Sequence, residues 1–159
     1  MTSCDVTVLK NSDLWDAVSA PPAYGDLCAL ALDGVAFLHG VEVTIVLTDD
    51  ADIRALNKTH RGIDKATNVL SFPAYAPDEP QPPGVAAPLG DIVLAYETIA
   101  REAEAQGKAF TDHLTHLIIH GTLHLLGHDH EEDDEAEAME ALEVRILDGL
   151  GIKNPYADE

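Results

Sequence analysis

The histidines of this sequence are concentrated in one short segment. Six of the eight lie between His113 and His130. Within the segment His120 and His124 are four residues apart, and His130 follows six residues later, with Gly127 in between. Residues four apart lie one turn apart on a helix, so both imidazoles project from the same face. The chain is therefore expected to form a helix through these two residues and to leave it near Gly127.

This spacing makes His120, His124 and His130 a candidate metal site. Gly127 permits the left-handed conformation in which a helix ends, and the chain can then bring His130 back to the same point. Three neutral imidazoles leave one tetrahedral position open for water, which is typical of a catalytic rather than a structural zinc site. Such water ionises near pH ~7 and supplies a nucleophile at neutral pH. The sequence thus predicts one Zn²⁺ per chain.

The competing interpretation is that these histidines are ordinary residues of an amphipathic helix, as most lone histidines are. The spacing of four and then six residues with an intervening glycine disfavours it. For His113, His116 and His128 the preference is reversed, because nothing in the spacing brings them to the ion. We expect these three histidines to pack, cap or contact solvent. As an alternative, His128 could bind the metal in place of His130.

The same spacing matches the metzincin protease pattern H-E-x-x-H-x-x-G-x-x-H at every position but one. Gly121 stands where those proteases carry the glutamate that serves as general base. Without that glutamate the site needs a different base or a substrate with a better leaving group. Met139 lies within a helical pattern and is predicted to be a core residue rather than part of a metzincin Met-turn. A metzincin-like metalloprotease is therefore the weaker enzymatic alternative.

Short apolar segments alternate with helical patterns along the chain. Runs rich in Val, Ile, Leu and Thr predict strands at 6–9, 41–47, 69–72 and 91–95. Helical periodicity and capping residues predict helices at 21–39, 50–57, 96–106, 110–126 and 131–150. This order indicates an α/β or α+β fold, in which a small mixed sheet of about four strands packs with about five helices. The histidine site then lies at the end of a central helix.

Two connecting segments have a distinctive composition. Residues 58–65 are expected to form an exposed basic turn. Residues 73–90 contain six prolines and little apolar periodicity. Proline lacks the backbone N–H and resists helix interiors and central strands, so a long loop is predicted there, either mobile or serving as a lid.

Length and composition favour one domain that spans residues 1–159. A content of 46% hydrophobic residues is enough for a core without disulfides. The two cysteines are Cys4 and Cys28, and residues 1–30 lack the unbroken apolar stretch of a signal peptide. No apolar run approaches the roughly 20 residues that span a bilayer. We expect a cytoplasmic protein with reduced thiols and no membrane partner.

The formal net charge of −20 opposes general binding to nucleic acid, because nucleic-acid binders usually present basic surface to phosphates. The few cations are clustered, however. Four of the nine lysines and arginines fall within twelve positions, namely Arg54, Lys58, Arg61 and Lys65. A divalent metal held by neutral imidazoles would add positive charge at its own site. Recognition of a phosphate is therefore expected to be local.

Three segments of the sequence resemble the YbeY family of bacterial endoribonucleases. They are residues 56–73, with the sequence LNKTHRGIDKATNVLSFP, residues 89–92, with LGDI, and the histidine segment 120–130. All three occur in the order expected for the family. The resemblance extends from about residue 41 to residue 156.

The resemblance implies a single-strand-specific, metal-dependent endoribonuclease built on a small α/β domain. Its implied roles are maturation of ribosomal RNA, particularly processing of small-subunit 16S RNA, and ribosome quality control. The family's three zinc ligands correspond to His120, His124 and His130, and its functionally important arginine corresponds to Arg61. Ribosomal RNA and the small ribosomal subunit are the implied partners, and DNA is not expected.

Arg61 has a physical role that suits this activity. A guanidinium can bind a phosphate with two hydrogen bonds and stabilise the charge that builds during phosphodiester cleavage. The alternative is an ordinary exposed arginine in a turn, and Lys58 and Lys65 are weaker candidates for attracting phosphate. A non-enzymatic alternative also stays open, in which the protein is a ribosome-assembly factor with structural zinc. A fourth ligand from the protein would favour it, because a closed site cannot bind substrate.

Overall fold

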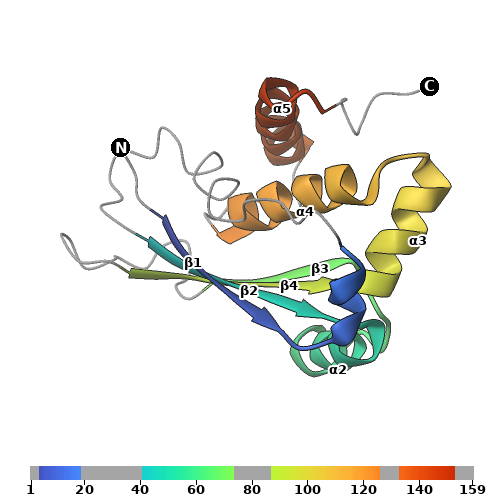
Figure 1. Ribbon diagram of the computed structural model, residues 1–159. Coiled ribbons are helices and arrows are strands. Elements are labelled where there is room, and N and C mark those ends of the chain that lie inside the picture. The colour runs from blue at the N-terminus through green and yellow to red at the C-terminus, as the bar shows by residue number, and fades with distance from the viewer. Residues whose placement is uncertain (1–3, 19–40, 74–86, 126–132, 153–159) are drawn as a thin grey trace.

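The computed structural model describes residues 4–18, 41–73, 87–125 and 133–152. In chain order its elements are β1 (Cys4–Lys10), the short 3-10 helix η1 (Asp13–Ala17), β2 (Val41–Thr48), α2 (Asp50–Arg61), β3 (Val69–Pro73), β4 (Ala87–Ala95), α3 (Tyr96–Gln106), α4 (Phe110–Leu125) and α5 (Asp133–Gly149). The predicted class of a four-stranded mixed sheet packed with helices is confirmed (Figure 1). The helix predicted at 21–39 lies outside the described residues, as do Gly127, His128 and His130.

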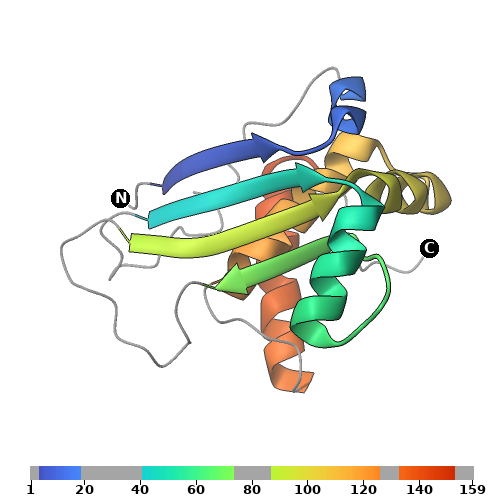
Figure 2. The same ribbon diagram turned by 90° about the horizontal axis from the view of Figure 1, so that it is seen from below.

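The strands form one sheet in the order β1-β2-β4-β3. β2 pairs in parallel with both β1 and β4, whereas β3 runs antiparallel to β4 and has no second neighbour among the described strands. α4 lies on one face of the sheet and α2 on the other, and α5 lies on the outer side of α4 (Figure 1, Figure 2). The sheet therefore separates α2 from the helix that carries the histidines.

α4 is the central helix of the fold. Ten of its sixteen residues are buried. Its sheet-facing side joins a core formed with the strands through Leu114, Leu117, Ile118 and Leu125. Its side toward α5 joins a smaller cluster of Ile119, Leu123, Met139 and Leu147, and the prediction that Met139 is a core residue is confirmed. Within the described part of the chain, no helix has both the length and the apolar character needed to cross a membrane.

α2 is longer than the sequence pattern suggests. Asp49 caps its start by accepting a hydrogen bond from the backbone N–H of Asp52 at 2.9 Å. The helix continues to Arg61 and ends at Gly62, which has a left-handed φ of 72°. The prediction of a turn throughout 58–65 is therefore wrong for residues 58–61. The helix continues until the first residue that adopts the left-handed conformation without steric cost.

The predicted loop at 73–90 is shorter than expected at both ends. Pro73 ends β3, and residues 87–90 extend β4, while residues 74–86 lie outside the described residues. Gly90 makes this extension possible, because its φ of 147° is a conformation that residues with a side chain rarely adopt. The pairing of β2 with β4 shifts register just before Gly90, between Glu42 and Val43.

Candidate metal centre

Four histidines lie along one face of α4. His113, His116, His120 and His124 follow one another at intervals of three or four residues, which stacks their side chains along the helix. The ring centroids are 6.3 Å apart from His113 to His116, 6.0 Å from His116 to His120, and 4.6 Å from His120 to His124. The rings therefore approach most closely at the C-terminal end of α4, where the metal site is predicted.

The Nε2 atoms of His120 and His124 lie 3.1 Å apart. Two nitrogens bound to one tetrahedral zinc ion, each at about 2 Å, lie roughly 3.4 Å apart. The two rings thus have nearly the spacing of ligands to a common ion, and both are half-buried rather than sealed from solvent. The structure brings together two of the three predicted ligands. The third, His130, lies outside the described residues.

A carboxylate from α5 contacts the same row of histidines. Glu143 is completely buried. One of its oxygens contacts Nδ1 of His120, and the other lies 3.4 Å from Nε2 of His116. The donor atoms of His116, His120 and Glu143 all lie within 4.8 Å of one another, so these residues could hold a metal ion. His120 belongs both to this trio and to the pair with His124, with a different ring nitrogen facing each.

Glu143 is absent from the site predicted by sequence, although the sequence contains a signal for it. Glu143 falls within an apolar helix face that it shares with Met139, Leu142, Ile146 and Leu147. A lone carboxylate on a face that becomes buried requires a polar partner. Its partners include His116, which the sequence assigned to packing, capping or solvent.

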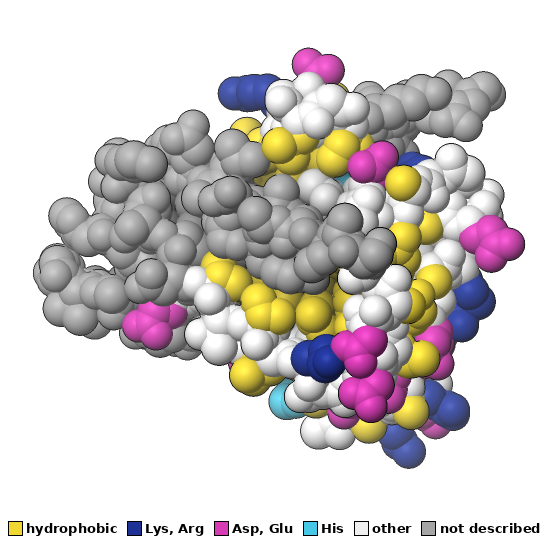
Figure 3. Space-filling view, viewed as in Figure 1, with side chains coloured by type: hydrophobic (Ala, Val, Ile, Leu, Met, Phe, Trp, Pro, Cys, Tyr) yellow, Lys and Arg dark blue, Asp and Glu magenta, His cyan; other side chains and the backbone are white. Residues whose placement is uncertain are grey.

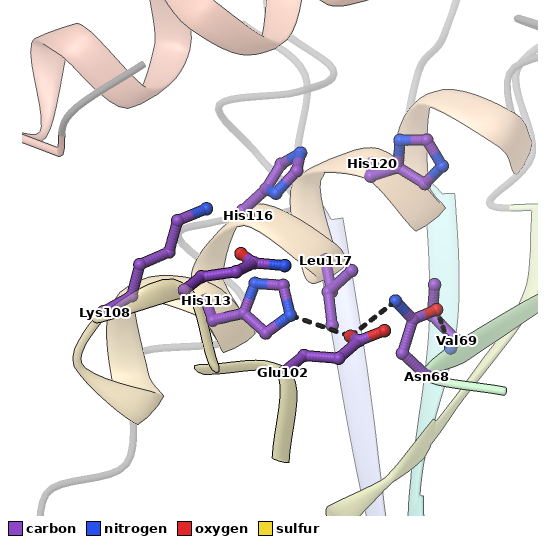
Figure 4. A pocket seen from close by; sticks show the side chains of 9 residues that line it. Asn68, Val69, Glu102, Lys108, His113, His116, Leu117 and His120 are labelled. Atoms are coloured by element: carbon purple, nitrogen blue, oxygen red, sulfur yellow. Dashed lines mark hydrogen bonds and ion pairs between the residues drawn. The ribbon is translucent and has the colours of Figure 1, made fainter. Parts of the chain in front are cut away.

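A polar cavity of about 260 Å³ lies beside His116 and His120 (Figure 4). On its α3 side, Glu102 accepts hydrogen bonds from Nε2 of His113 and from the Asn68 amide, both at 2.9 Å. Burial lowers the pKa of His113 below its ordinary value of 6.5 and outweighs the opposite effect of the Glu102 carboxylate. His113 therefore links α4 to α3 as a buried residue. Packing is one of the three roles, packing, capping or contact with solvent, that the sequence allows for it.

Gly121 packs directly against the sheet. A Cβ atom at this position would lie 3.0 Å from Oγ of Ser71 and 3.1 Å from Cγ2 of Ile92. The Ser71 hydroxyl also donates a hydrogen bond to the Gly121 carbonyl at 3.0 Å. A glutamate here would therefore be forced into the sheet rather than toward the histidines. Packing against the sheet thus disfavours a glutamate at this position.

Arg61 is the exposed last residue of α2, a helix that lies on the face of the sheet opposite α4 (Figure 2). The preceding residue, His60, packs its ring against Phe72 of β3 with centroids 4.9 Å apart. This contact holds the end of α2 beside the edge of the sheet. Within the described residues, no hydrogen bond or ion pair joins Arg61 to the histidine row, so its catalytic role stays a prediction.

The basic cluster around Arg61 is reduced by one ion pair. Arg54 binds Asp64 at 2.8 Å, and both side chains are exposed. In the described part of the chain, no ion pair involves Lys58, Arg61 or Lys65. Around α2 and α3, acidic and basic side chains are interspersed on the surface (Figure 3). Of the four clustered cations, Lys58, Arg61 and Lys65 therefore remain available to a ligand at the end of α2 and in the segment that follows it.

Residues 21–151 of the chain match the family model described as endoribonuclease YbeY. The chain belongs to the YbeY family. The family model matches from residue 21, whereas the resemblance found in the sequence starts at about residue 41. The match to the family model includes the end of α2, β3, β4 and the whole histidine row.

Individual YbeY relatives match most of the chain. The endoribonuclease YbeY of Rhodopseudomonas palustris strain BisB18 is 56% identical over 157 residues, which cover 96% of this chain and 92% of the relative. The endoribonuclease YbeY of Bradyrhizobium diazoefficiens is 60% identical over 118 residues, which cover 74% of this chain and 64% of the relative. A Thermotoga maritima protein with a solution structure has a TM-score of 0.55 at 20% identity, covering 96% of this chain and 99% of its own. The last similarity supports the fold alone.

Proposed function

We propose that this YbeY-family protein is a metal-dependent endoribonuclease that cleaves single-stranded RNA. The observation that carries the proposal is the approach of His120 and His124, whose Nε2 atoms lie 3.1 Å apart at the end of α4. The relatives named endoribonuclease YbeY support RNA as the substrate. The protein acts in the cytoplasm on ribosomal RNA, at the small subunit, in RNA maturation and ribosome quality control.

The metal is one zinc ion held by His120, His124 and His130. Imidazole nitrogens are common ligands for zinc. Nδ1 of His120 already has Glu143 as a hydrogen-bond partner, whereas its Nε2 faces Nε2 of His124. The ion is therefore held on the Nε2 side of the ring, which faces His124. When bound there, zinc polarises a phosphoryl oxygen and lowers the pKa of water in an open coordination position.

Arg61 binds the phosphate next to the bond that is cleaved. Its planar guanidinium can donate two hydrogen bonds to phosphate oxygens and stabilise charge that increases in the transition state. Lys58 and Lys65 lie close to it in the sequence and attract the RNA backbone. The remaining surface repels phosphates because the net charge is −20. Such a protein selects RNA that is presented at this one edge, as a ribosomal subunit can present it.

Replacing Arg61 with alanine is expected to lower the rate of RNA cleavage by about 10²- to 10³-fold, which is the cost of losing one group that stabilises transition-state charge. Zinc content is expected to stay unchanged, because Arg61 is not a ligand. Both quantities can be measured on the purified protein with a labelled single-stranded RNA from the small subunit, with and without small subunits. The matched control is Arg54→Ala on the same helix, whose guanidinium is engaged by Asp64 and whose loss should leave cleavage near the wild-type rate.

The same assay distinguishes the alternatives. Intact RNA in the presence of bound zinc, with and without subunits, would indicate an assembly factor with structural zinc. Cleavage of denatured casein, but not of RNA, would indicate a metalloprotease, against which the packing of Gly121 already argues. Equal cleavage by wild type and Arg61→Ala would refute the role of Arg61 but would leave the proposed endoribonuclease activity standing.

A further inference from the structure

We infer that Glu143 is a positioning residue that orients the metal-binding ring of His120 from α5, and that it thereby couples the seating of α5 on α4 to metal binding. The inference rests on the proposed metal site. It assigns Glu143 to the support of a ligand and not to the ligand set, although its oxygens lie near two imidazoles.

Burial requires that Glu143 has polar partners. The Glu143 side chain has no exposed surface, and its helix neighbours Met139, Leu142, Ile146 and Leu147 are apolar. A carboxylate in such surroundings is strongly destabilising unless hydrogen bonds or opposite charges satisfy it. Its two oxygens reach different imidazoles, His120 through Oε1 and His116 through Oε2. Two attachment points prevent the carboxylate from rotating and fix the direction in which it faces His120.

The contact determines which His120 nitrogen is available to a metal. A carboxylate beside Nδ1 accepts a hydrogen bond from it and keeps the proton of the neutral ring on that nitrogen. The lone pair then lies on Nε2, the atom that faces Nε2 of His124 at 3.1 Å. Without Glu143 the His120 ring could rotate, or it could carry its proton on Nε2. Either state would have to be reversed before Nε2 of His120 could bind a metal.

The origin of Glu143 on α5 links this contact to tertiary structure. α5 packs on α4 through a small cluster that includes Ile119 and Leu123 of α4, next to His120 and His124 in sequence. Displacing α5 from its packed position on α4 would move the Glu143 carboxylate away from His120. A metal bound at His120 therefore stabilises the seated position of α5, since ligand binding favours the conformation that binds more tightly.

The test is zinc affinity, measured without RNA by competition with a chromophoric chelator. Glu143→Gln is expected to weaken zinc binding by about 10- to 100-fold, which is typical for loss of a group that orients a histidine ligand. Glu140→Gln, an exposed position on the same helix, is the matched control and should keep the wild-type affinity. Glu143→Leu, which replaces the buried carboxylate with an apolar side chain of similar size, should weaken zinc binding as well, even if it stabilises the metal-free fold. A purely structural role for Glu143 would change stability without changing affinity.

A cobalt-substituted sample separates orientation from direct coordination. With Co²⁺ in place of zinc, the visible absorption of Glu143→Gln should match that of the wild type once both are saturated, because the ligands are the same. A changed spectrum would make Glu143 a ligand and overturn the inference. Wild-type zinc affinity in Glu143→Gln would also overturn the inference about Glu143. The proposed metal site would still stand in that case if His124→Ala loses zinc in the same assay. Retention of zinc by His124→Ala together with its loss from Glu143→Gln would contradict both.

Discussion

Replacing His124 with alanine is expected to remove zinc from the purified protein and to abolish RNA cleavage. Zinc binding contributes about 10–16 kcal/mol in sites with four protein ligands, so one ligand is worth on the order of 3 kcal/mol. Loss of His124 should therefore weaken zinc binding roughly 10²-fold or more. Zinc content after gel filtration and cleavage of single-stranded RNA are the two measurements, and both should fall together.

His116→Gln is the informative comparison for His124→Ala. His116 lies on the same helix face and contacts Glu143, but the proposed site does not use it as a ligand. The His116→Gln protein is expected to retain its zinc. The opposite pattern, with zinc lost from His116→Gln and kept by His124→Ala, would put the ion among His116, His120 and Glu143. That result would contradict the proposed ligand set.

Replacing Gly90 with alanine is expected to lower the free energy of unfolding by about 2–6 kcal/mol, the sum of backbone strain and overpacking. The added Cβ would lie 2.3 Å from the backbone oxygen of Phe72 and 2.7 Å from a methyl group of Leu125, at a φ of 147°. Backbone atoms of the neighbouring strand cannot move aside as a flexible side chain can. Because Leu125 follows His124, the displacement also reaches the metal site. Urea denaturation of the metal-free protein measures the loss.

Gly107→Ala provides the control for this effect. Gly107 also has a positive φ, of 67°, but a Cβ there would meet nothing within 4 Å. Only the cost of the left-handed backbone applies, which is about 1 kcal/mol. If Gly90→Ala and Gly107→Ala lose the same free energy of unfolding, the close approach of β3 would not be the reason that position 90 requires glycine.

Periodicity was sufficient to predict most of the elements from sequence. α3 has the predicted bounds, and all four predicted strands are present. The errors lie at element ends, where tertiary contacts decide. Residues 87–90 extend β4 because they pair with β2, and no local pattern in a proline-rich segment indicates that pairing. The end of α2 at Gly62 could have been predicted from the sequence, because a glycine that follows a last turn with basic residues commonly ends a helix.

The approach of His120 to His124 could be predicted because it depends on helix geometry alone. The contact of Glu143 with His120 could not, because it depends on how α5 lies on α4, and residues 23 positions apart carry no mutual spacing rule. The sequence pattern shows a glutamate on an apolar face without naming its partner. For Arg61 the limit is similar, since its position relative to the histidines depends on the path of the chain around the edge of the sheet.

The proposed function requires that zinc held by His120, His124 and His130 drives RNA cleavage. Its most direct test is to strip the purified protein of metal, return zinc in steps, and measure cleavage of a single-stranded ribosomal RNA against the zinc bound. Cleavage is expected to be absent at first, to rise in proportion to bound zinc, and to reach its maximum at about one ion per chain. Full cleavage by the metal-free protein, or none at full occupancy with small subunits present, would contradict the claim.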